Sequence, residues 1–188
     1  LAEAMLFAAK GIGRLGRVED GNTVSDFDAE EQKRQTSLQI SLVPCAWKGT
    51  KINLIDTPGY ADFVGETASA LRAADAAVLV VSATGGIEVG TQVAWQRIRE
   101  LGLPALVFIS RMDREHADYD GTMAQIRAQL SNRCAALNLP IGAESNFSGM
   151  VDLLGGVPAD LRAGADQARD LLAEAVAETD DDLATKYL

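Results

Sequence analysis

The stretch that most constrains the fold of this chain runs from residue 52 to residue 60 and reads I-N-L-I-D-T-P-G-Y. Its apolar start predicts a strand, and Thr57, Pro58 and Gly59 after Asp56 predict a tight turn. A carboxylate at the carboxyl end of a strand, followed by a glycine whose N–H can approach a ligand, suits a site for phosphate and magnesium. Ordinary strand ends carry the same pattern, so its meaning depends on the rest of the chain.

Strands and helices alternate on both sides of this stretch. Residues 38–47 alternate and then become apolar, and a turn leads to the strand at 51–56, which predicts an antiparallel hairpin. Helical periodicity and continuous apolar runs predict the elements that follow, namely helices at 63–73, 89–101 and 119–137 and buried strands at 76–81 and 104–109. This order predicts an α/β fold, a mostly parallel sheet with helices on both faces.

Two aspartates follow different strands of this predicted sheet. Asp56 closes the strand at 51–56, and Asp113 comes just after the strand at 104–109. Ligands of open α/β sheets bind at the carboxyl ends of the strands. We therefore expect the two aspartates to belong to one site.

The residues before the hairpin give weaker signals. Residues 1–9 have the spacing of a helix, and Gly11 is interpreted as the end of that helix. Gly11 to Gly16 match the dinucleotide pattern G-x-G-x-x-G, but that pattern needs a strand before it and a helix after it. Here a helix precedes the match and the polar segment 16–35, a predicted loop, follows it, so we reject the match.

The end of the chain changes character. Residues 139–156 hold short apolar pieces interrupted by glycine and asparagine, and residues 157–160 open a second helical region. Residues 167–188 are predicted to form one acidic amphipathic helix. The carboxylates within 178–182 lack a glycine-bearing loop of calcium-binding spacing, so we interpret them as a solvated face rather than a metal site.

Composition excludes several functional classes. The net charge of −10 argues against broad binding to nucleic-acid backbones. No apolar run approaches the roughly 20 residues that a membrane-spanning helix needs. Cys45 and Cys134 are too few for a disulfide framework or a zinc site, which favours a cytoplasmic protein with reduced thiols. His116 is the only histidine, so catalytic sites built on several histidines are nearly excluded.

Four segments resemble motifs of the translational GTPases, most closely those of elongation factor G and its paralogues. Residues 34–38, R-Q-T-S-L, resemble the end of switch I, and residues 56–59, D-T-P-G, resemble the start of switch II. Residues 110–113, S-R-M-D, resemble the guanine-recognition motif. Residues 141–153 resemble the start of the insert found in elongation factor G, and the acidic helix is similar to part of that insert.

The resemblance covers essentially the whole chain and implies a GTPase that uses GTP or GDP and Mg²⁺. It implies a P-loop NTPase-type fold, with a GTP-binding domain at 1–138 and a partial insert subdomain with the acidic helix at 139–188. The residues that it places against the nucleotide are Asp56, Thr57, Pro58, Gly59, Tyr60, Ser110, Arg111, Met112 and Asp113.

The resemblance also assigns chemical roles. Asp56 would hold Mg²⁺ through water, and a switch I hydroxyl would complete the magnesium shell, Ser37 by alignment, with Thr36 as the alternative. The Gly59 N–H would bond the γ-phosphate. Asp113 would accept hydrogen bonds from guanine N1–H and N2–H₂, which selects guanine because adenine has no donor at N1.

The chain departs from the family pattern at several places. No G-x-x-x-x-G-K-[ST] loop occurs, and the helix at 1–9 resembles the one after that loop, so we expect the loop to precede residue 1 in the complete protein. Tyr60 stands where elongation factor G has its catalytic histidine, so we expect slow or altered hydrolysis. Ser110 and Arg111 replace Asn and Lys, which weakens recognition, while Asp113 keeps the guanine preference.

These features predict an elongation factor G-like GTP-binding domain that acts as a monomer on the ribosome. Its expected contacts are the large-subunit factor site and, through the acidic helix, the stalk protein, with no membrane and no sequence-specific nucleic acid. A non-catalytic module that senses guanine nucleotide or binds the ribosome is the alternative, and Tyr60 is the feature that separates the two. A flavodoxin-like module also fits the sheet pattern, but it leaves Asp113 unexplained.

Overall fold

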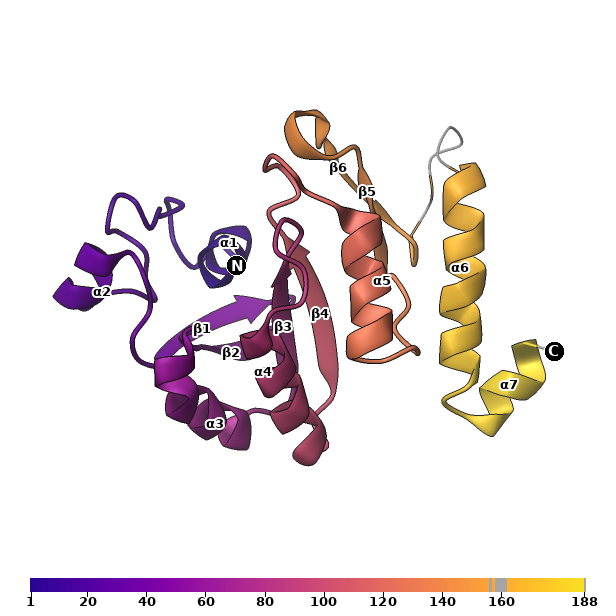
Figure 1. The fold of residues 1–188 in the computed structure, drawn as a ribbon, viewed down its shortest axis with the longest axis horizontal. Coiled ribbons are helices and arrows are strands. Elements are labelled where there is room, and N and C mark those ends of the chain that lie inside the picture. The colour runs from indigo at the N-terminus through magenta and orange to yellow at the C-terminus, as the bar shows by residue number, and fades with distance from the viewer. Residues whose placement is uncertain (156, 158–161, 188) are drawn as a thin grey trace. The chain divides into compact units, whose positions relative to one another are not determined.

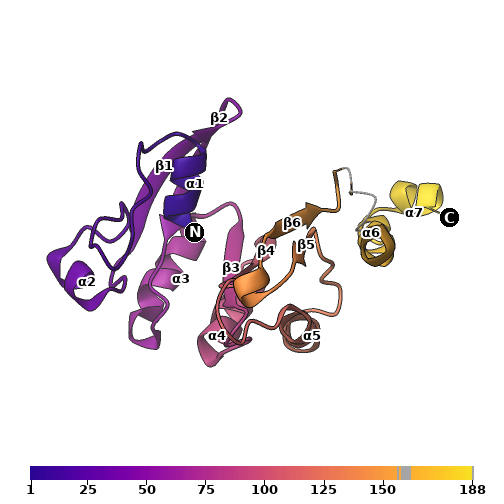
Figure 2. The ribbon, with the colours of Figure 1, turned by 90° about the horizontal axis from the view of Figure 1, so that it is seen from above.

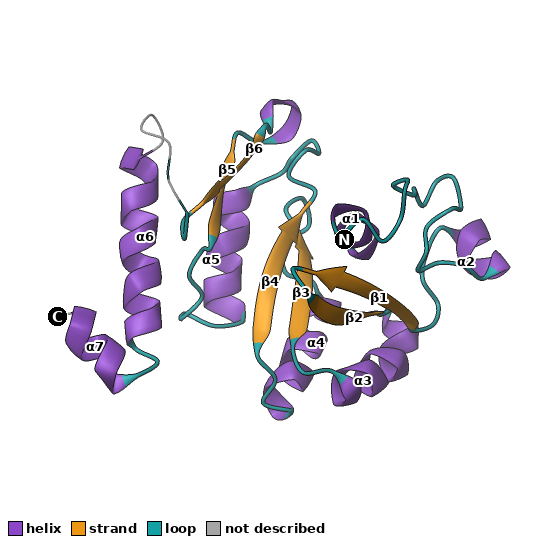
Figure 3. Ribbon diagram, turned by 180° about the vertical axis from the view of Figure 1, so that it is seen from behind, coloured by secondary structure: helices purple, strands orange, loops and turns teal. Residues whose placement is uncertain are grey.

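The computed structural model describes residues 1–155, 157 and 162–187. The chain forms two compact units, Leu1–Ala77 with Val93–Ala105, and Val78–Gln92 with Leu106–Leu188. Among the described residues the strands form three two-stranded sheets. Figures 1, 2 and 3 show the labelled helices and strands. The predicted α/β composition is therefore present.

An antiparallel hairpin forms the centre of the first unit. It consists of β1 (Ser41–Trp47) and β2 (Thr50–Asp56), with Trp47 opposite Thr50 at the turn and Ser41 opposite Asp56 at the far end. Helix α1 (Ala2–Ala8) lies beside β1 (Figure 2). Its Leu6 forms a buried cluster with Val43 and Cys45 of that strand. The predicted hairpin and the predicted helix at 1–9 are confirmed.

Helix α1 ends one residue earlier than its glycine suggested. The left-handed conformation is taken by Lys10, at φ 57°, and not by Gly11. The Lys10 N–H bonds to the Phe7 carbonyl at 3.0 Å and the Gly11 N–H bonds to the Leu6 carbonyl at 2.9 Å. This is the bond pattern of a Schellman cap, in which Lys10 occupies the position that glycine usually fills.

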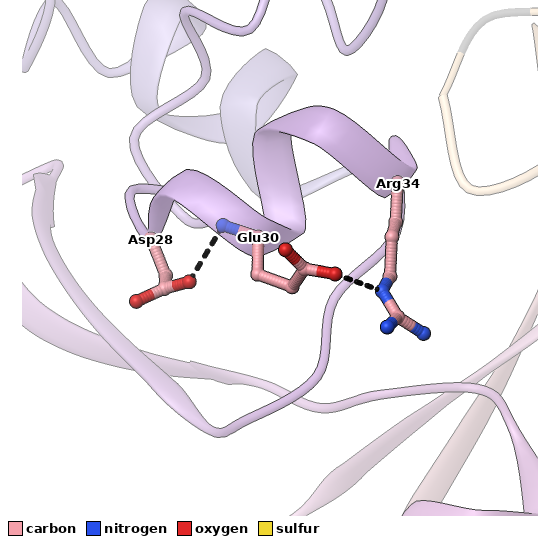
Figure 4. Close-up of polar contacts among 3 residues, drawn as sticks. All are labelled: Asp28, Glu30 and Arg34. Carbon is pink, nitrogen blue, oxygen red and sulfur yellow. Dashed lines mark hydrogen bonds and ion pairs between the residues drawn. The ribbon is translucent and has the colours of Figure 1, made fainter.

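The polar segment after α1 is not the uniform loop that its composition predicts. It contains helix α2 (Ala29–Arg34), which begins at Asp28 with a capping box between Asp28 and Glu31. Figure 4 shows the Asp28 carboxylate accepting from the Glu30 N–H, and the Glu30 carboxylate pairing with Arg34. The prediction was wrong here because the helix is too short for a periodic apolar face, whereas the D-x-x-E capping signature marks its start.

Two further helices match their predictions. A 3₁₀ turn, η1 (Ala61–Phe63), leads into α3 (Val64–Ala73), and α4 (Val89–Glu100) follows β3 along the chain. Gly102, at φ 64°, closes the end of α4, where its N–H bonds to the Arg99 carbonyl at 3.1 Å. A glycine takes this left-handed conformation without steric cost.

The strands β3 (Ala77–Ser82) and β4 (Ala105–Ser110) pair with each other and run parallel. The Ala77 N–H bonds to the Pro104 carbonyl and the Ala83 N–H bonds to the Ser110 carbonyl, so both partners advance in the same direction. The prediction that β3 and β4 are buried on both faces was wrong for this chain. The buried residues of β3 alternate with the half-exposed Val78 and Val80, and Leu106 and Phe108 of β4 are exposed.

Helix α5 (Tyr119–Gln129) begins at Asp118 and is shorter than predicted. The Asp118 carboxylate accepts from the Gly121 N–H at 2.9 Å, and the helix ends at Leu130 instead of Leu137. Beyond it the chain turns, and the Leu137 carbonyl accepts the Leu153 N–H at 3.0 Å. A bond to a distant segment therefore replaces the helical bonds that periodicity alone predicted.

The second unit continues with a hairpin that the sequence pattern did not predict. β5 (Asn138–Ile141) and β6 (Gly149–Asp152) are antiparallel, and the 3₁₀ turn η2 (Glu144–Asn146) lies between them. Four-residue strands are too short to show a clear period of two, which explains the omission.

The predicted acidic helix consists of two helices, α6 (Arg162–Ala177) and α7 (Asp181–Tyr187). The Asp180 side chain causes the break, because it accepts from the N–H groups of Asp182 at 2.9 Å and Leu183 at 3.1 Å. A buried cluster joins α6 to the β5–β6 hairpin and contains Val151, Leu153, Val157, Ala165 and Leu172. The predicted helical start at 158–160 lies outside the described residues.

Candidate functional site

The end of β2 presents the first group of predicted site residues. Asp56 and Thr57 are half-buried, and Pro58 is buried, where its carbonyl accepts from the Thr67 hydroxyl at 3.3 Å. Gly59 is exposed, and a Cβ there would meet nothing within 4 Å. The Thr67 bond ties the turn to α3, so that the Gly59 backbone stays open to solvent.

Tyr60 follows this turn and caps the 3₁₀ turn η1 through its backbone. Its carbonyl accepts the Phe63 N–H at 3.0 Å. The Tyr60 side chain is 61% exposed, so it is not part of a packed core in this chain. The exposed phenol and the exposed Gly59 backbone are adjacent along the chain and both face solvent.

The predicted switch I hydroxyl already has a partner. Ser37 donates to the Asp26 carboxylate at 2.7 Å, and Asp26 is buried. Thr36 donates its backbone N–H to the Glu31 carbonyl at 3.2 Å, and Gln35 before it takes a left-handed conformation at φ 56°. This arrangement fixes the backbone at both candidate hydroxyls.

Glu31 is the most enclosed charged residue of this segment, at 1% exposure. One carboxylate oxygen accepts from the Leu38 N–H at 2.9 Å and the Gln39 N–H at 3.2 Å, and the other accepts from the Asp28 N–H at 3.3 Å. The carboxylate thereby joins the start of α2 to the residues that follow Ser37.

Glu3 performs a similar task at the beginning of the segment. Its two carboxylate oxygens accept from the Gly16 N–H and the Val24 N–H, both at 2.9 Å. Sequence reasoning missed Glu3, Asp26 and Glu31. Only Glu31 carried a signal, its capping-box spacing from Asp28, because the partners of the other two depend on the path of the folded loop.

The second group of predicted residues lies at the end of β4. Ser110 donates its hydroxyl to the Val81 carbonyl at 3.2 Å, which ties β4 to β3. Met112 is buried, whereas Arg111 and Asp113 on either side of it are exposed. The buried methionine anchors a turn that leaves a guanidinium and a carboxylate free to meet a ligand.

This turn is bonded to the tip of the β5–β6 hairpin. The Glu144 N–H donates to the Met112 carbonyl at 2.8 Å, and the Glu144 carboxylate accepts from the His116 N–H at 2.7 Å. Sequence reasoning did not single out Glu144, since nothing in the local pattern marks a contact with a partner 28 residues away.

The structure places the site residues in two sets. Ser37 and residues 56–60 belong to the first unit, and residues 110–113 belong to the second. No group of three or more His, Cys, Asp or Glu side chains within the described ranges is arranged to hold a metal ion. No helix in that part of the chain is long and apolar enough to cross a membrane.

Comparison with known proteins identifies the family. The family model described as "Elongation factor Tu GTP binding domain" matches residues 1–182. Elongation factor G 2 of Streptomyces coelicolor is 39% identical over 95% of this chain and 28% of its own length. Elongation factor G 1 of Geobacter sulfurreducens is 35% identical over 100% of this chain and 30% of its own length.

A crystal structure of a protein from Thermus thermophilus matches with a TM-score of 0.90 and 34% identity, over 99% of this chain and 30% of that chain. The chain thus spans less than a third of the length of these relatives. The predicted fold class and the predicted resemblance are confirmed. This chain belongs to the family of elongation factor Tu GTP binding domains.

Proposed function

We propose that this chain is the GTP-binding domain of an elongation factor G-like GTPase that works on the ribosome and hydrolyses GTP to GDP and phosphate. The observation that carries the proposal is the S-R-M-D turn at the end of β4, where a buried Met112 leaves Asp113 exposed, in a chain that matches this domain family. In this proposal residues 1–138 form the GTP-binding part and residues 139–188 form part of an insert.

Guanine selection rests on Asp113. Its carboxylate accepts from guanine N1–H and N2–H₂, and a nucleotide without these donors leaves it unpaired. Arg111 is exposed at φ 60° and supplies a planar guanidinium that stacks on the base. The Ser110 hydroxyl donates to the Val81 carbonyl and so ties the turn to β3.

The residues at the end of β2 fit a magnesium ion that is shared with a nucleotide. Mg²⁺ takes one or two protein oxygens and fills its other positions with phosphate and water, so Asp56 and one hydroxyl suffice. We assign the hydroxyl to Ser37, with Thr36 as the alternative. Ser37 must then exchange its bond with Asp26 for the metal, which neutralises charge on the bound phosphates.

Tyr60 is the residue from which we infer the rate of GTP hydrolysis. Its exposure supports a role at the nucleotide rather than in packing, and its hydroxyl offers one hydrogen bond to the attacking water. The phenol is bulkier than an imidazole and orients water less favourably, so we expect slow hydrolysis. Exposed Gly59 offers its N–H to the γ-phosphate next to this water.

The finer assignments concern location and partners. We assign the protein to the cytoplasm, which the free thiols of Cys45 and Cys134 support. We also propose that it acts as a monomer. The large-subunit factor site and the stalk protein are the proposed ribosomal contacts. The acidic residues Asp180, Asp181 and Asp182 at the start of α7 are the surface proposed for the stalk.

A non-catalytic role is the second candidate, and the feature that favours it is the tyrosine at position 60, where the family has its catalytic histidine. Such a protein binds guanine nucleotide and the ribosomal factor site without turnover. It lacks a residue that activates water but keeps Asp113 for guanine.

The test measures GTP and GDP affinity and hydrolysis by the full-length protein, with and without ribosomes. Tyr60→His is compared with Tyr60→Phe, which keeps the ring and removes the hydroxyl. We expect Tyr60→His to raise ribosome-stimulated hydrolysis about tenfold or more. Guanine binding without turnover in either form supports the non-catalytic role, and absence of guanine binding refutes both roles.

A further inference from the structure

Glu144 joins two segments of the second unit by both its backbone and its side chain. Its N–H donates to the Met112 carbonyl at 2.8 Å. Its carboxylate accepts from the His116 N–H at 2.7 Å, three residues beyond Asp113. Glu144 therefore bonds to the chain on both sides of Asp113, at Met112 before it and at His116 after it.

Both segments adopt backbone conformations that need such support. Arg111, His116 and Glu144 have φ values of 60°, 67° and 53° and are not glycine. A left-handed conformation is sterically unfavourable for residues of this kind and persists only where surrounding bonds determine it. The two bonds of Glu144 connect it to His116 and to Met112, the residue next to Arg111.

The hairpin tip is itself rigid enough to act as a support. The Ser148 N–H bonds to the Ile141 carbonyl at 2.9 Å and closes the tip. Gly142 has φ 75°, and a Cβ at this position would collide with the Asn146 carbonyl. Glu144 thus lies in a loop that is closed by a hydrogen bond, which restricts the positions of its backbone and side chain.

We propose that Glu144 is a positioning residue for guanine recognition, which fixes the turn at 110–113 in the conformation that engages the base. The proposal rests on the proposed function, because it assumes that Asp113 reads guanine. Without the Glu144 carboxylate, the turn samples conformations in which Asp113 does not reach the base. These conformations bind GDP and inosine diphosphate alike, so both the affinity for GDP and the preference for GDP over inosine diphosphate fall.

The substitution that tests this is Glu144→Ala in the full-length protein. Glu144→Gln keeps an oxygen that accepts the His116 N–H, so it should restore wild-type behaviour. Glu115→Ala is the matched control, because Glu115 is an exposed acid next to His116 and lies 3.9 Å from its ring nitrogen. If the Ala variant fails to fold, Glu144→Asp replaces it, since the shorter side chain keeps the charge but withdraws the oxygen.

The readout is the ratio of the inosine diphosphate Kd to the GDP Kd. Inosine lacks the N2 amino group, so this ratio measures how well Asp113 is placed, whereas a general loss of folded protein leaves it unchanged. We expect Glu144→Ala to lower GDP affinity about tenfold and to reduce the ratio, because one charge-assisted hydrogen bond is lost. Glu144→Gln and Glu115→Ala should keep both values within about twofold.

The possible outcomes distinguish a failure of this inference from a failure of the proposed function. If the wild-type protein prefers guanine and Glu144→Ala keeps the ratio, the inference is wrong and the proposed function stands. If Glu115→Ala has the same effect as Glu144→Ala, the effect is one of charge and the inference is also wrong. If the wild-type protein shows no guanine preference, the proposed function fails and the inference fails with it.

Discussion

The buried carboxylate of Glu31 should hold the whole segment between α1 and β1, and Glu31→Ala tests this directly. The substitution removes the acceptor of three backbone N–H groups. All three bonds are part-buried, and the bond from the Asp28 N–H is the longest, at 3.3 Å. The loss is therefore governed by the two shorter bonds, from the N–H groups of Leu38 and Gln39.

The expected magnitude follows from these two bonds. A hydrogen bond to a charged group contributes about 1.5–3 kcal/mol, so the loss of two should destabilise the segment by about 3 kcal/mol or more. Glu30→Ala is the matched control one residue away. It breaks an exposed i,i+4 ion pair with Arg34, which contributes only about 0.3–0.5 kcal/mol.

Limited trypsin digestion measures the local opening of this segment. The segment contains sites at Arg17, Lys33 and Arg34, and cleavage tracks the population of the open form when opening is fast. A loss of about 3 kcal/mol corresponds to a roughly hundredfold faster cleavage for Glu31→Ala. Cleavage of Glu31→Ala that stays within about threefold of Glu30→Ala would refute the reasoning.

Three further substitutions or modifications test single contacts, at Asp26, Cys134 and Gly142. Asp26→Ala removes the acceptor of the Ser37 hydroxyl and should weaken the segment by about 1–2 kcal/mol in the same digestion, and an unchanged rate would count against this bond. Burial raises the pKa of the Cys134 thiol, so less thiolate is present at pH 8 and alkylation by iodoacetamide should be slower than for a small free thiol; equal rates would contradict this. Gly142→Ala forces a Cβ toward the Asn146 carbonyl at a left-handed position and should lower the thermal midpoint by about 4–8 °C, for a cost of about 2 kcal/mol, whereas an unchanged midpoint would show that the tip relaxes.

Periodicity and turn chemistry were sufficient where an element is long or ends at a marked residue. The alternation before Trp47 and the turn before Thr50 predicted the hairpin, and the D-T-P-G run predicted where β2 ends. Helices α3 and α4 and the strand β4 also appeared close to their predicted bounds. These features are local, because they depend on residues within one or two turns of each other.

Predictions became wrong where a side chain or a distant segment ended an element. Asp180 divides the predicted acidic helix because its side chain caps α7. The residues predicted to end α5 are not helical, and the Leu137 carbonyl accepts the Leu153 N–H instead. The helix α2 was overlooked although Asp28 marked its start. A periodic pattern continues through such positions, while the competing hydrogen bond does not appear in it.

The residues that hold the candidate site divide in the same way. The placement of Asp56 at the end of β2 and of Asp113 just after β4 was predicted from the sequence, since each stands beside a characteristic turn. The partners of Glu3 and Glu144, and the bonds of Glu31 to the N–H groups of Leu38 and Gln39, were decided only by the tertiary structure. Their carboxylates bond to backbone N–H groups, which every residue carries, so the sequence holds no mark of which group is chosen until the chain is folded.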